Sequence, residues 1–335
     1  MLLFHNRNGG VNMQNINILF AQYIPFVIIG ALLLVVLLVI ITSYVCFLMT
    51  FYNKPKNLDP NSDEIKLPSY KVYKVYGKEI TRDIQDVRKI PYQEMEIKSF
   101  DGLTLKGKYY EYKKGASIEL MMHGYKGNGE RDLSTGVLRA FKCKRNVLLV
   151  DQRASGSSEG KVISFGVNER KDCLMWVDHL IKTFGDDIQI YLTGVSMGAS
   201  TVINAASSET LPKNVIGVLA DCGYDNQKEI IKKYVRDMKL PPNLFYPFIK
   251  LGAKLFGRFD LEEIYPIDAV KKIKIPVIFI HGDCDDFVPC YMSENMYKAC
   301  NSEKSFVVVE GSDHGVAYLV KPDYYIEELN KVFNK

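Results

Sequence analysis

The chain has 335 residues and a net charge of +4, with 47% hydrophobic and 24% charged residues. Its lysines and arginines are spread along the chain, without a basic block that alternates with aromatic residues, so nucleic acid is not an expected partner. None of the seven cysteines forms a C-x-x-C pair, and no cysteine–histidine cluster has zinc spacing. Free buried thiols are therefore expected, which weakly favours a reducing compartment or an organism that never meets oxygen.

Residues 24–50 contain no charged side chain. This run is long enough to cross a bilayer, for which about 20 residues suffice. A buried core helix of this length would show a polar face, and a signal peptide would have a shorter apolar region that ends in small residues. Here bulky Phe51 and Tyr52 follow. We therefore expect a single-pass membrane anchor, with a transmembrane helix over residues 23–52.

The flanks of this segment bear on its orientation. A polar tail is expected over residues 1–22, with Arg7 as its only formal side-chain charge. Lys54 and Lys56 follow the apolar run on the other side. The positive-inside rule then leans slightly toward a cytoplasmic C-terminal domain. The oligomeric state is not indicated.

A juxtamembrane linker is expected over residues 53–92, because it carries charges of both signs and four prolines. Within it, residues 78–87 are predicted to form a short helix. Two alternating segments, residues 93–99 and 103–112, are predicted to pair as a hairpin around the turn signal Asp101-Gly102.

Strands and helices alternate beyond the hairpin. Apolar strands are predicted over residues 117–122, 146–150, 188–193, 215–220, 276–280 and 305–309, and helices over residues 131–142, 167–184, 199–206 and 318–333. Apolar, β-branched strands separated by helices favour a mainly parallel sheet with both faces covered. We therefore expect one α/β domain over residues 93–335, opened by the two antiparallel strands.

One interval, residues 223–274, interrupts this alternation. It contains a charged helical segment over residues 228–238 and then the aromatic run Phe245-Tyr246-Pro247-Phe248-Ile249. An apolar insertion at the carboxyl edge of a sheet suggests a lid over a pocket. Extra helices that only pack on the rim are the alternative.

Polar motifs follow three of the predicted strands. Gly194-Val195-Ser196-Met197-Gly198 joins a strand to a helix with Ser196 at the apex, which is the setting of a nucleophile elbow. Asp283, Asp285 and Asp286 follow a second strand, and His314 follows a third. Because the carboxyl ends of parallel strands meet at one edge of a sheet, these groups are expected to lie close together.

Five motifs occur in order: His123-Gly124, Asp151-x-Arg153, Gly194-x-Ser196-x-Gly198, Asp285-x-x-Val288-Pro289 and Gly311-x-x-His314. Together they resemble the α/β-hydrolase superfamily, most closely its serine-aminopeptidase-like and acyl-hydrolase group, over roughly residues 90–335. The resemblance implies an α/β-hydrolase fold with the order serine, acid, histidine. It also singles out Asp285, because the family places the acid three residues before Val-Pro. The chain departs from the family pattern at Ala154, where such turns usually carry glycine.

The resemblance implies a role for each of five residues. Ser196 would be the nucleophile, His314 the base that takes its proton, and Asp285 the carboxylate that orients the imidazole. The backbone N–H groups of Met197 and Tyr125 would form the oxyanion hole. No cofactor and no metal are implied. His123 is expected to support the Tyr125 loop, and Asp151 and Asp221 to make hydrogen bonds within turns.

The expected function is that of a membrane-anchored serine hydrolase that cleaves an ester, thioester or amide through an acyl-enzyme. The anchor and the apolar lid suggest a small-molecule or lipid-like acyl substrate. An aminopeptidase-like peptidase that acts on short peptides is the alternative among enzymes. A catalytically silent, membrane-bound binding module is the alternative outside them.

Overall fold

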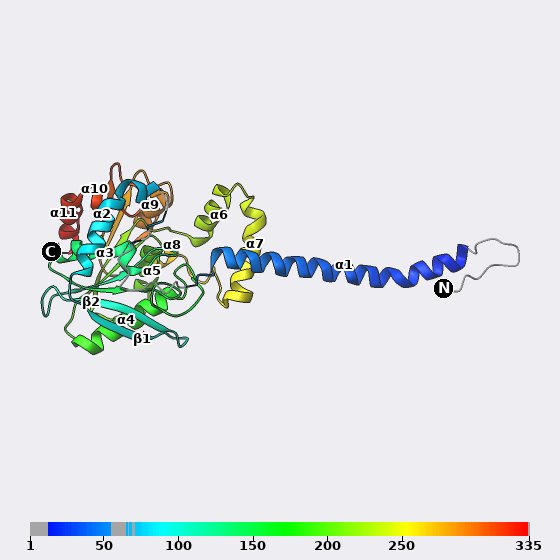
Figure 1. The fold of residues 1–335 in the computed structure, drawn as a ribbon, viewed down its shortest axis with the longest axis horizontal. Coiled ribbons are helices and arrows are strands. Elements are labelled where there is room, and N and C mark those ends of the chain that lie inside the picture. Colours follow the sequence, from blue (N-terminus) through cyan, green and yellow to red (C-terminus); the bar gives the residue numbers. More distant parts are fainter. Residues whose placement is uncertain (1–12, 55–64, 66, 69–70, 334–335) are drawn as a thin grey trace.

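The computed structural model describes residues 13–54, 65, 67–68 and 71–333. A long helix, α1 (Met13–Thr50), projects from one end of a body built on an eight-stranded sheet (Figure 1). Its stretch from Ala21 to Thr50 is long and apolar enough to cross a membrane. The helix starts within the segment expected as a polar tail, of which residues 1–12 lie outside the described residues.

The described side chains of α1 fall into two parts. All those from Ala21 to Leu38 are exposed. Nearer the body, Ser43, Cys46 and Phe47 are buried, as is Phe51 just beyond the helix. The uniform apolar run of the sequence therefore contains an uncovered part and a part that packs on the body.

The helix α2 (Lys71–Arg88) occupies much of the segment expected as a linker. It is longer than the helix predicted over residues 78–87 because its amphipathic pattern begins earlier. Ile80, Ile84 and Val87 are buried, and the helix packs on α3 (Gly129–Lys142). This segment is thus part of the folded body. Residues 55–64, 66 and 69–70 of the expected linker lie outside the described residues.

The sheet has the strand order β1-β2-β4-β3-β5-β6-β7-β8. The predicted hairpin pairs β1 (Gln93–Lys98) with β2 (Thr104–Tyr110), and both are antiparallel to their neighbours. The remaining strands are parallel: β3 (Ile118–Met122), β4 (Asn146–Val150), β5 (Ile190–Val195), β6 (Val215–Asp221), β7 (Val277–Gly282) and β8 (Lys304–Val309). All residues of β3 and β4 are buried, as expected for central strands covered on both faces.

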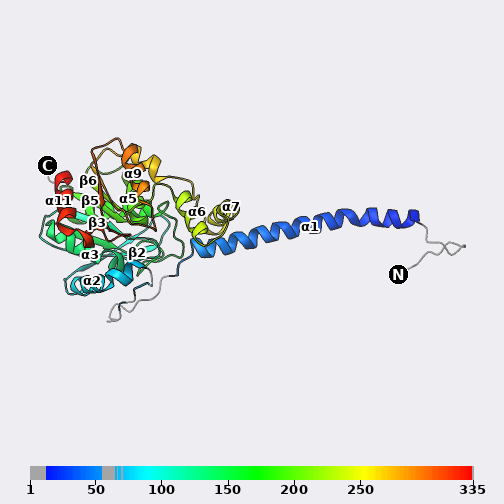
Figure 2. The same cartoon turned by 90° about the horizontal axis from the view of Figure 1, so that it is seen from above.

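Helices cover both faces of the sheet, which confirms the predicted α/β layers (Figure 2). Alternate side chains of β3 serve the two faces: Leu120 and Met122 join one core cluster, and Met121 joins another. The first face carries α4 (Glu169–Phe184), α5 (Met197–Ala206), α8 (Pro266–Ala269) and α9 (Cys290–Ala299). The second carries α3, α10 (Ala317–Val320) and α11 (Pro322–Phe333). The single closing helix predicted over residues 318–333 is divided because Pro322 has no N–H to donate within a helix.

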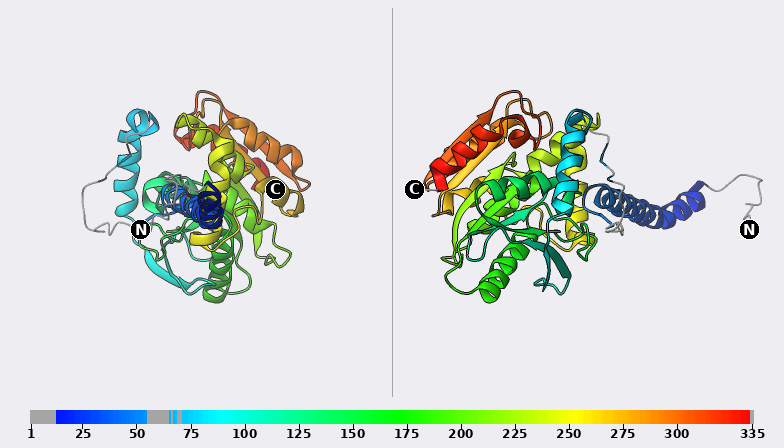
Figure 3. Two further views of the ribbon diagram at one scale, coloured as in Figure 1. Left: turned by 90° about the vertical axis from the view of Figure 1, so that its right-hand side faces the viewer. Right: turned by 60° about the vertical axis from the view of Figure 1, so that its left-hand side comes forward.

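Residues 223–274 fold as several short helices. The first two, α6 (Gln227–Asp237) and α7 (Pro242–Gly252), lie at the end of the body from which α1 projects (Figures 1 and 2). We call them the lid pair. A π-helical turn, η1 (Ala253–Gly257), follows α7, and later α8 and η2 (Val270–Lys272) pack on α5. Seen along α1, α2 lies on one side of that helix and the lid pair on the other (Figure 3). The segment therefore contains both lid-like and rim-packing helices.

Candidate active site

Ser196 occupies a sharp turn between β5 and α5. Its φ of 58° and ψ of −120° are values that side-chain-bearing residues rarely adopt. A Cβ on Gly194 would collide with the backbone of Gly198, and a Cβ on Gly198 would collide with the carbonyl of Met122. Both positions therefore require glycine, because a side chain would not fit. The turn presents Ser196 at the carboxyl edge of the sheet.

The loops after β7 and β8 bring Asp285 and His314 together. Nδ1 of His314 lies 2.6 Å from Oδ2 of Asp285. The other carboxylate oxygen accepts the backbone N–H groups of Phe287 at 2.9 Å and Val288 at 2.8 Å. Because an ionised carboxylate only accepts, Nδ1 of His314 donates, and its Nε2 is left as an acceptor. That is the tautomer a general base needs.

The two neighbouring aspartates lie elsewhere. Oδ1 of Asp283 accepts the N–H of Gly311 at 2.7 Å, and Asp286 is largely exposed near Lys71. Burial alone would raise the pKa of Asp285, but His314 and His281 outweigh it and hold that pKa well below its usual range. Asp285 is thus the carboxylate that stays ionised beside the imidazole.

Ser196 and His314 line the same cavity, which has a volume of about 1120 Å³. Among the described residues, no hydrogen bond joins their side chains. Hydrogen bonds of this kind are often long without substrate and shorten when it binds. The ring of Phe287 lies 5.0 Å from that of His314 and restricts its position. The cavity therefore contains a serine hydroxyl and an imidazole that is oriented by a buried carboxylate.

Met197 directly follows Ser196 in the chain, and Tyr125 lines the same cavity as Ser196. Met197 is the first residue of α5, so its N–H has no acceptor within the helix. Tyr125 lies in the loop after β3 and also lines the cavity. His123 is fully buried beneath this loop, where its Nδ1 lies 2.8 Å from the Gly124 carbonyl and its Nε2 accepts the Gln152 N–H at 3.0 Å. The supporting role predicted for His123 is confirmed.

The other two strand-end aspartates differ from each other. Asp151 accepts the N–H groups of Gly129 and Ser157, which confirms its predicted role in a turn. Asp221 does not have that role. Its Oδ2 accepts the hydroxyl of Tyr325 from α11 at 2.8 Å, and burial raises its pKa. The contact could not be predicted from the sequence, because Asp221 and Tyr325 are 104 positions apart.

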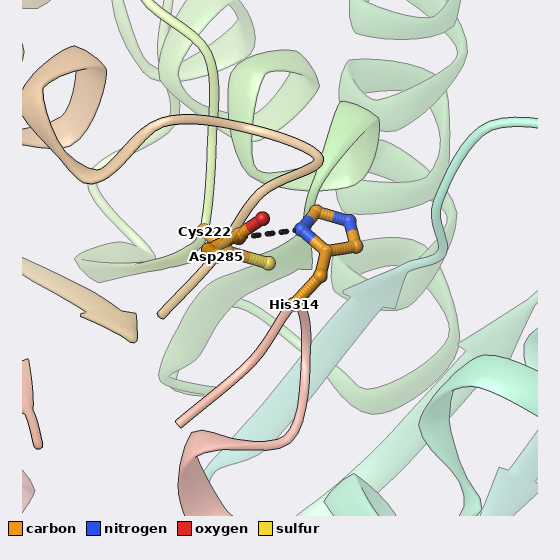
Figure 4. Close-up of side chains that lie close together, drawn as sticks. All are labelled: Cys222, Asp285 and His314. Atoms are coloured by element: carbon orange, nitrogen blue, oxygen red, sulfur yellow. Dashed lines mark hydrogen bonds and ion pairs between the residues drawn. The ribbon is translucent and has the colours of Figure 1, made fainter. Parts of the chain in front are cut away.

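Cys222 is a neighbour of the Asp285–His314 pair that sequence reasoning missed. Its thiol lies beside the two side chains in Figure 4, and one ligand atom from each of the three residues lies within 4.8 Å of the others. Among the described residues this is the one group with metal-ligand chemistry at such spacing. Burial raises the pKa of the Cys222 thiol well above its usual range, which disfavours the thiolate a metal requires. The geometry suits a hydrogen-bonded pair with an apolar thiol beside it.

His281 is a second functional neighbour that the sequence did not reveal. It is fully buried at the end of β7, with Nε2 2.8 Å from the Val288 carbonyl and Nδ1 2.7 Å from Oγ of Ser293. The same Nε2 lies 3.2 Å from Oδ2 of Asp285. The motif His281-Gly282 marks a strand end, but nothing in its spacing indicates that the ring faces the acid.

The comparisons with known proteins agree with this architecture. No family model matches the chain. The uncharacterized protein YqkD of Bacillus subtilis is 30% identical over 174 residues, which cover 52% of this chain and 57% of that protein. The chain thus matches little more than half of that relative's length. WAV2 of Arabidopsis thaliana, named as an alpha/beta hydrolase domain-containing protein, is 26% identical over 249 residues, which cover 70% of this chain and 76% of that protein.

Solved structures extend the comparison. An esterase of Pyrococcus furiosus has a TM-score of 0.60 at 20% identity, covering 84% of this chain and 97% of that chain. An acylaminoacyl peptidase of Pyrococcus horikoshii has a TM-score of 0.53 at 18% identity, covering 73% of this chain and 41% of that chain. At these identities the likeness establishes the fold.

Proposed function

We propose that this chain, which has the α/β-hydrolase fold, is a membrane-anchored serine hydrolase that cleaves an ester, thioester or amide through an acyl-enzyme. The observation that carries the proposal is the Asp285–His314 hydrogen bond in the same cavity as the strained Ser196 turn. A buried, ionised acid that fixes one imidazole tautomer allows that imidazole to act as a base, and a serine at a helix N-terminus is placed to act as a nucleophile.

The reaction follows from these positions. Oγ of Ser196 attacks the substrate carbonyl while Nε2 of His314 accepts its proton. The N–H groups of Met197 and Tyr125 stabilise the negative oxygen of the tetrahedral intermediate. His314 then donates the proton to the departing alcohol, thiol or amine, which leaves the acyl group on Ser196. A water molecule, deprotonated by His314, releases the acid and restores the serine.

The membrane part of the proposal rests on α1. The described side chains from Ala21 to Leu38 are uncovered by the body and, apart from Gln22, predominantly apolar, which suits contact with lipid tails. Lys54 on the C-terminal flank and the absence of disulfides among the seven cysteines support a cytoplasmic catalytic domain. Protease treatment of sealed, right-side-out vesicles tests this orientation. If the domain is digested only after the vesicles are lysed, it faces the cytoplasm.

A fluorophosphonate probe applied to the full chain in detergent tests the enzyme. We expect covalent labelling of the wild type and none of Ser196→Ala. Ser157→Ala is the matched control, because this serine is exposed and lies outside the cavity; it should label like the wild type. No labelling of the wild type, or equal labelling of Ser196→Ala, would favour the catalytically silent binding module.

The peptidase alternative has one supporting observation besides the fold of the acylaminoacyl peptidase. Four aspartates line the cavity, Asp132, Asp237, Asp286 and Asp313, and their carboxylates could bind a peptide amine. Rates on aminoacyl p-nitroanilides and on p-nitrophenyl esters of graded chain length separate the two activities. A clear preference for the anilides would establish the peptidase.

A further inference from the structure

We propose that the last three turns of α1 form one wall of an acyl-chain subsite, so that Ser196 acts on a long-chain acyl lipid whose chain enters the cavity from the bilayer alongside α1. This inference rests on the proposed serine hydrolase and names its substrate class. It assigns a binding role to a helix that the sequence indicates only as an anchor.

One face of α1 lines the cavity. The lining residues form two rows with a spacing of four, which places them side by side on a helix. The rows are Ile41, Val45 and Met49, and Thr42, Cys46 and Thr50. From Ile41 to Met49 the wall extends for about 12 Å along the helix axis. This is an elongated, mostly apolar surface of the kind an acyl chain fits.

The lid pair forms the facing wall. The lid pair contributes the apolar residues Ile231, Val235, Phe245 and Ile249 to the cavity, together with Lys233 and Asp237, and the turn between its helices adds Leu240. The two walls are held at a fixed distance, because the backbones of α1 and α7 touch where Gly252 meets the Ser43 carbonyl. Phe47 and Phe51 are buried in the same apolar cluster as the lid pair. Their shared burial holds α1 against the lid pair.

The cavity changes in polarity along its length. Ser196 and His314 lie at one part of it, beside the charged side chains of Lys71 and Asp313. Near α1 and the lid pair, five apolar lining residues are each more than a third exposed: Ile41, Val45, Met49, Met238 and Leu240. An apolar opening of this kind marks a surface that meets another apolar phase. An amphiphile with its scissile carbonyl at Ser196 therefore has its chain directed toward α1 and the lid pair.

The uncovered part of α1 places that opening at the bilayer. From Ala21 to Leu38 the helix extends for about 27 Å, close to the hydrocarbon thickness of roughly 30 Å. The first cavity-lining residue, Ile41, follows within one turn. The exposed apolar lining residues Val45, Met49, Met238 and Leu240 thus lie at the edge of the hydrocarbon, where a lipid chain can enter without passing through water.

The C-terminal end of α1 is hydrogen-bonded to the loop after β3 that carries the proposed oxyanion N–H of Tyr125. The Tyr125 hydroxyl donates to the Thr50 carbonyl at 2.6 Å, and Nζ of Lys126 donates to the Met49 carbonyl at 3.1 Å. These carbonyls belong to the last turn of α1, where no intrahelical donor remains and where a cation is favoured. The wall of the chain subsite and the loop that carries the Tyr125 N–H are therefore one connected unit.

The test uses the full chain in phosphatidylcholine vesicles, with p-nitrophenyl palmitate in the bilayer and p-nitrophenyl acetate in solution. Val45→Trp fills the groove from the α1 side. It should lower the palmitate-to-acetate ratio of kcat/KM by about tenfold, the effect of losing burial of roughly two methylene groups. Val36→Trp is the matched control on the uncovered part of α1, and it should change the ratio by less than about twofold. Equal ratios for both variants would overturn the subsite.

A second measurement on the wild type does not depend on any variant folding. A long-chain alkyl fluorophosphonate with a terminal diazirine is bound to Ser196 and then photolysed. We expect crosslinks to peptides that contain residues 41–50 or 231–249. Labelled Ser196 with crosslinks only elsewhere would overturn the chain subsite and leave the serine hydrolase intact. Absence of any reaction at Ser196 would contradict the serine hydrolase itself.

Discussion

Nε2 of His281 lies 3.2 Å from Oδ2 of Asp285, the same oxygen that accepts the Nδ1–H of His314 at 2.6 Å. The acid therefore contacts two imidazoles, one that faces the cavity and one that is buried. The buried His281 ring contacts Oδ2 of Asp285 and fixes the position of the oxygen that orients His314. His281 is thus a positioning residue for the proposed base.

Replacement of His281 should weaken catalysis more than substrate binding. A hydrogen bond to a charged group contributes about 1.5–3 kcal/mol, so His281→Ala should lower kcat by roughly 10- to 100-fold while KM changes little. Ester hydrolysis over a range of substrate concentrations measures both constants. His179→Ala is a control, because this histidine lies on α4 outside the cavity. A rise in KM with unchanged kcat would show that His281 does not act through Asp285.

The depressed pKa of Asp285 predicts a pH dependence of stability. Its folded-state pKa is lower than the unfolded value of about 3.9, so ionisation favours the folded state. This contribution is fully present above the unfolded pKa and is lost as pH falls through the folded pKa. Asp285→Asn should therefore be less stable than the wild type at pH 7, by about 2 kcal/mol, and the difference should narrow at acid pH.

Urea unfolding at pH 7 and at progressively lower pH measures this difference. Asp286→Asn is the matched control because Asp286 is largely exposed, so its stability should follow the wild type at each pH. A constant difference between wild type and Asp285→Asn at all pH values would contradict the assignment.

The two glycines of the elbow should tolerate no side chain. A Cβ on Gly198 meets the Met122 carbonyl, which belongs to a central strand and cannot move away. Gly198→Ala should therefore lose at least about 3 kcal/mol of stability or fail to fold. Gly136→Ala in α3 meets only ordinary contacts and should gain about 0.5–1 kcal/mol. Thermal unfolding of both variants in detergent tests the pair, and equal stability of the two would contradict this explanation.

A side chain at Gly252 should separate α1 from the lid pair. Gly252→Ala places a Cβ against the Ser43 carbonyl and should destabilise the contact by about 1–3 kcal/mol. Gly30→Ala is the control in the uncovered part of α1, where no atom lies within 4 Å of the added Cβ. Limited proteolysis of α6 and α7 should become faster in Gly252→Ala only. Identical digestion of both variants would show that the crossing is not tight.

Local sequence patterns were sufficient to predict the helices and strands and the motifs that follow the strands. The hairpin around Asp101-Gly102 and the alternation of strands and helices depend on near neighbours in the sequence, so both were predictable. The Asp285–His314 contact could be expected because both residues follow neighbouring parallel strands. The choice among Asp283, Asp285 and Asp286 came from the family resemblance, since their spacing alone leaves all three open.

Contacts between distant segments were not predictable. Hydrophobicity is uniform along α1, so nothing in the run separates the uncovered part from the turns that meet α7. The ring of His281 and the thiol of Cys222 face Asp285 through backbone directions that residue types do not encode. The departure from the family pattern at Ala154 is likewise explained only by the backbone conformation. This residue has a φ of 60°, the left-handed conformation that favours the glycine of related turns.

The burial of Phe51 bears on how the proposed enzyme would be retained at a membrane. A protease that cut the chain between Lys54 and Lys71 would break the covalent connection between α1 and the catalytic domain. The helix would nevertheless remain docked, because Cys46, Phe47 and Phe51 lie in the same apolar cluster as Tyr246 and Ile249 of α7. Cleavage there would therefore not separate the body from α1.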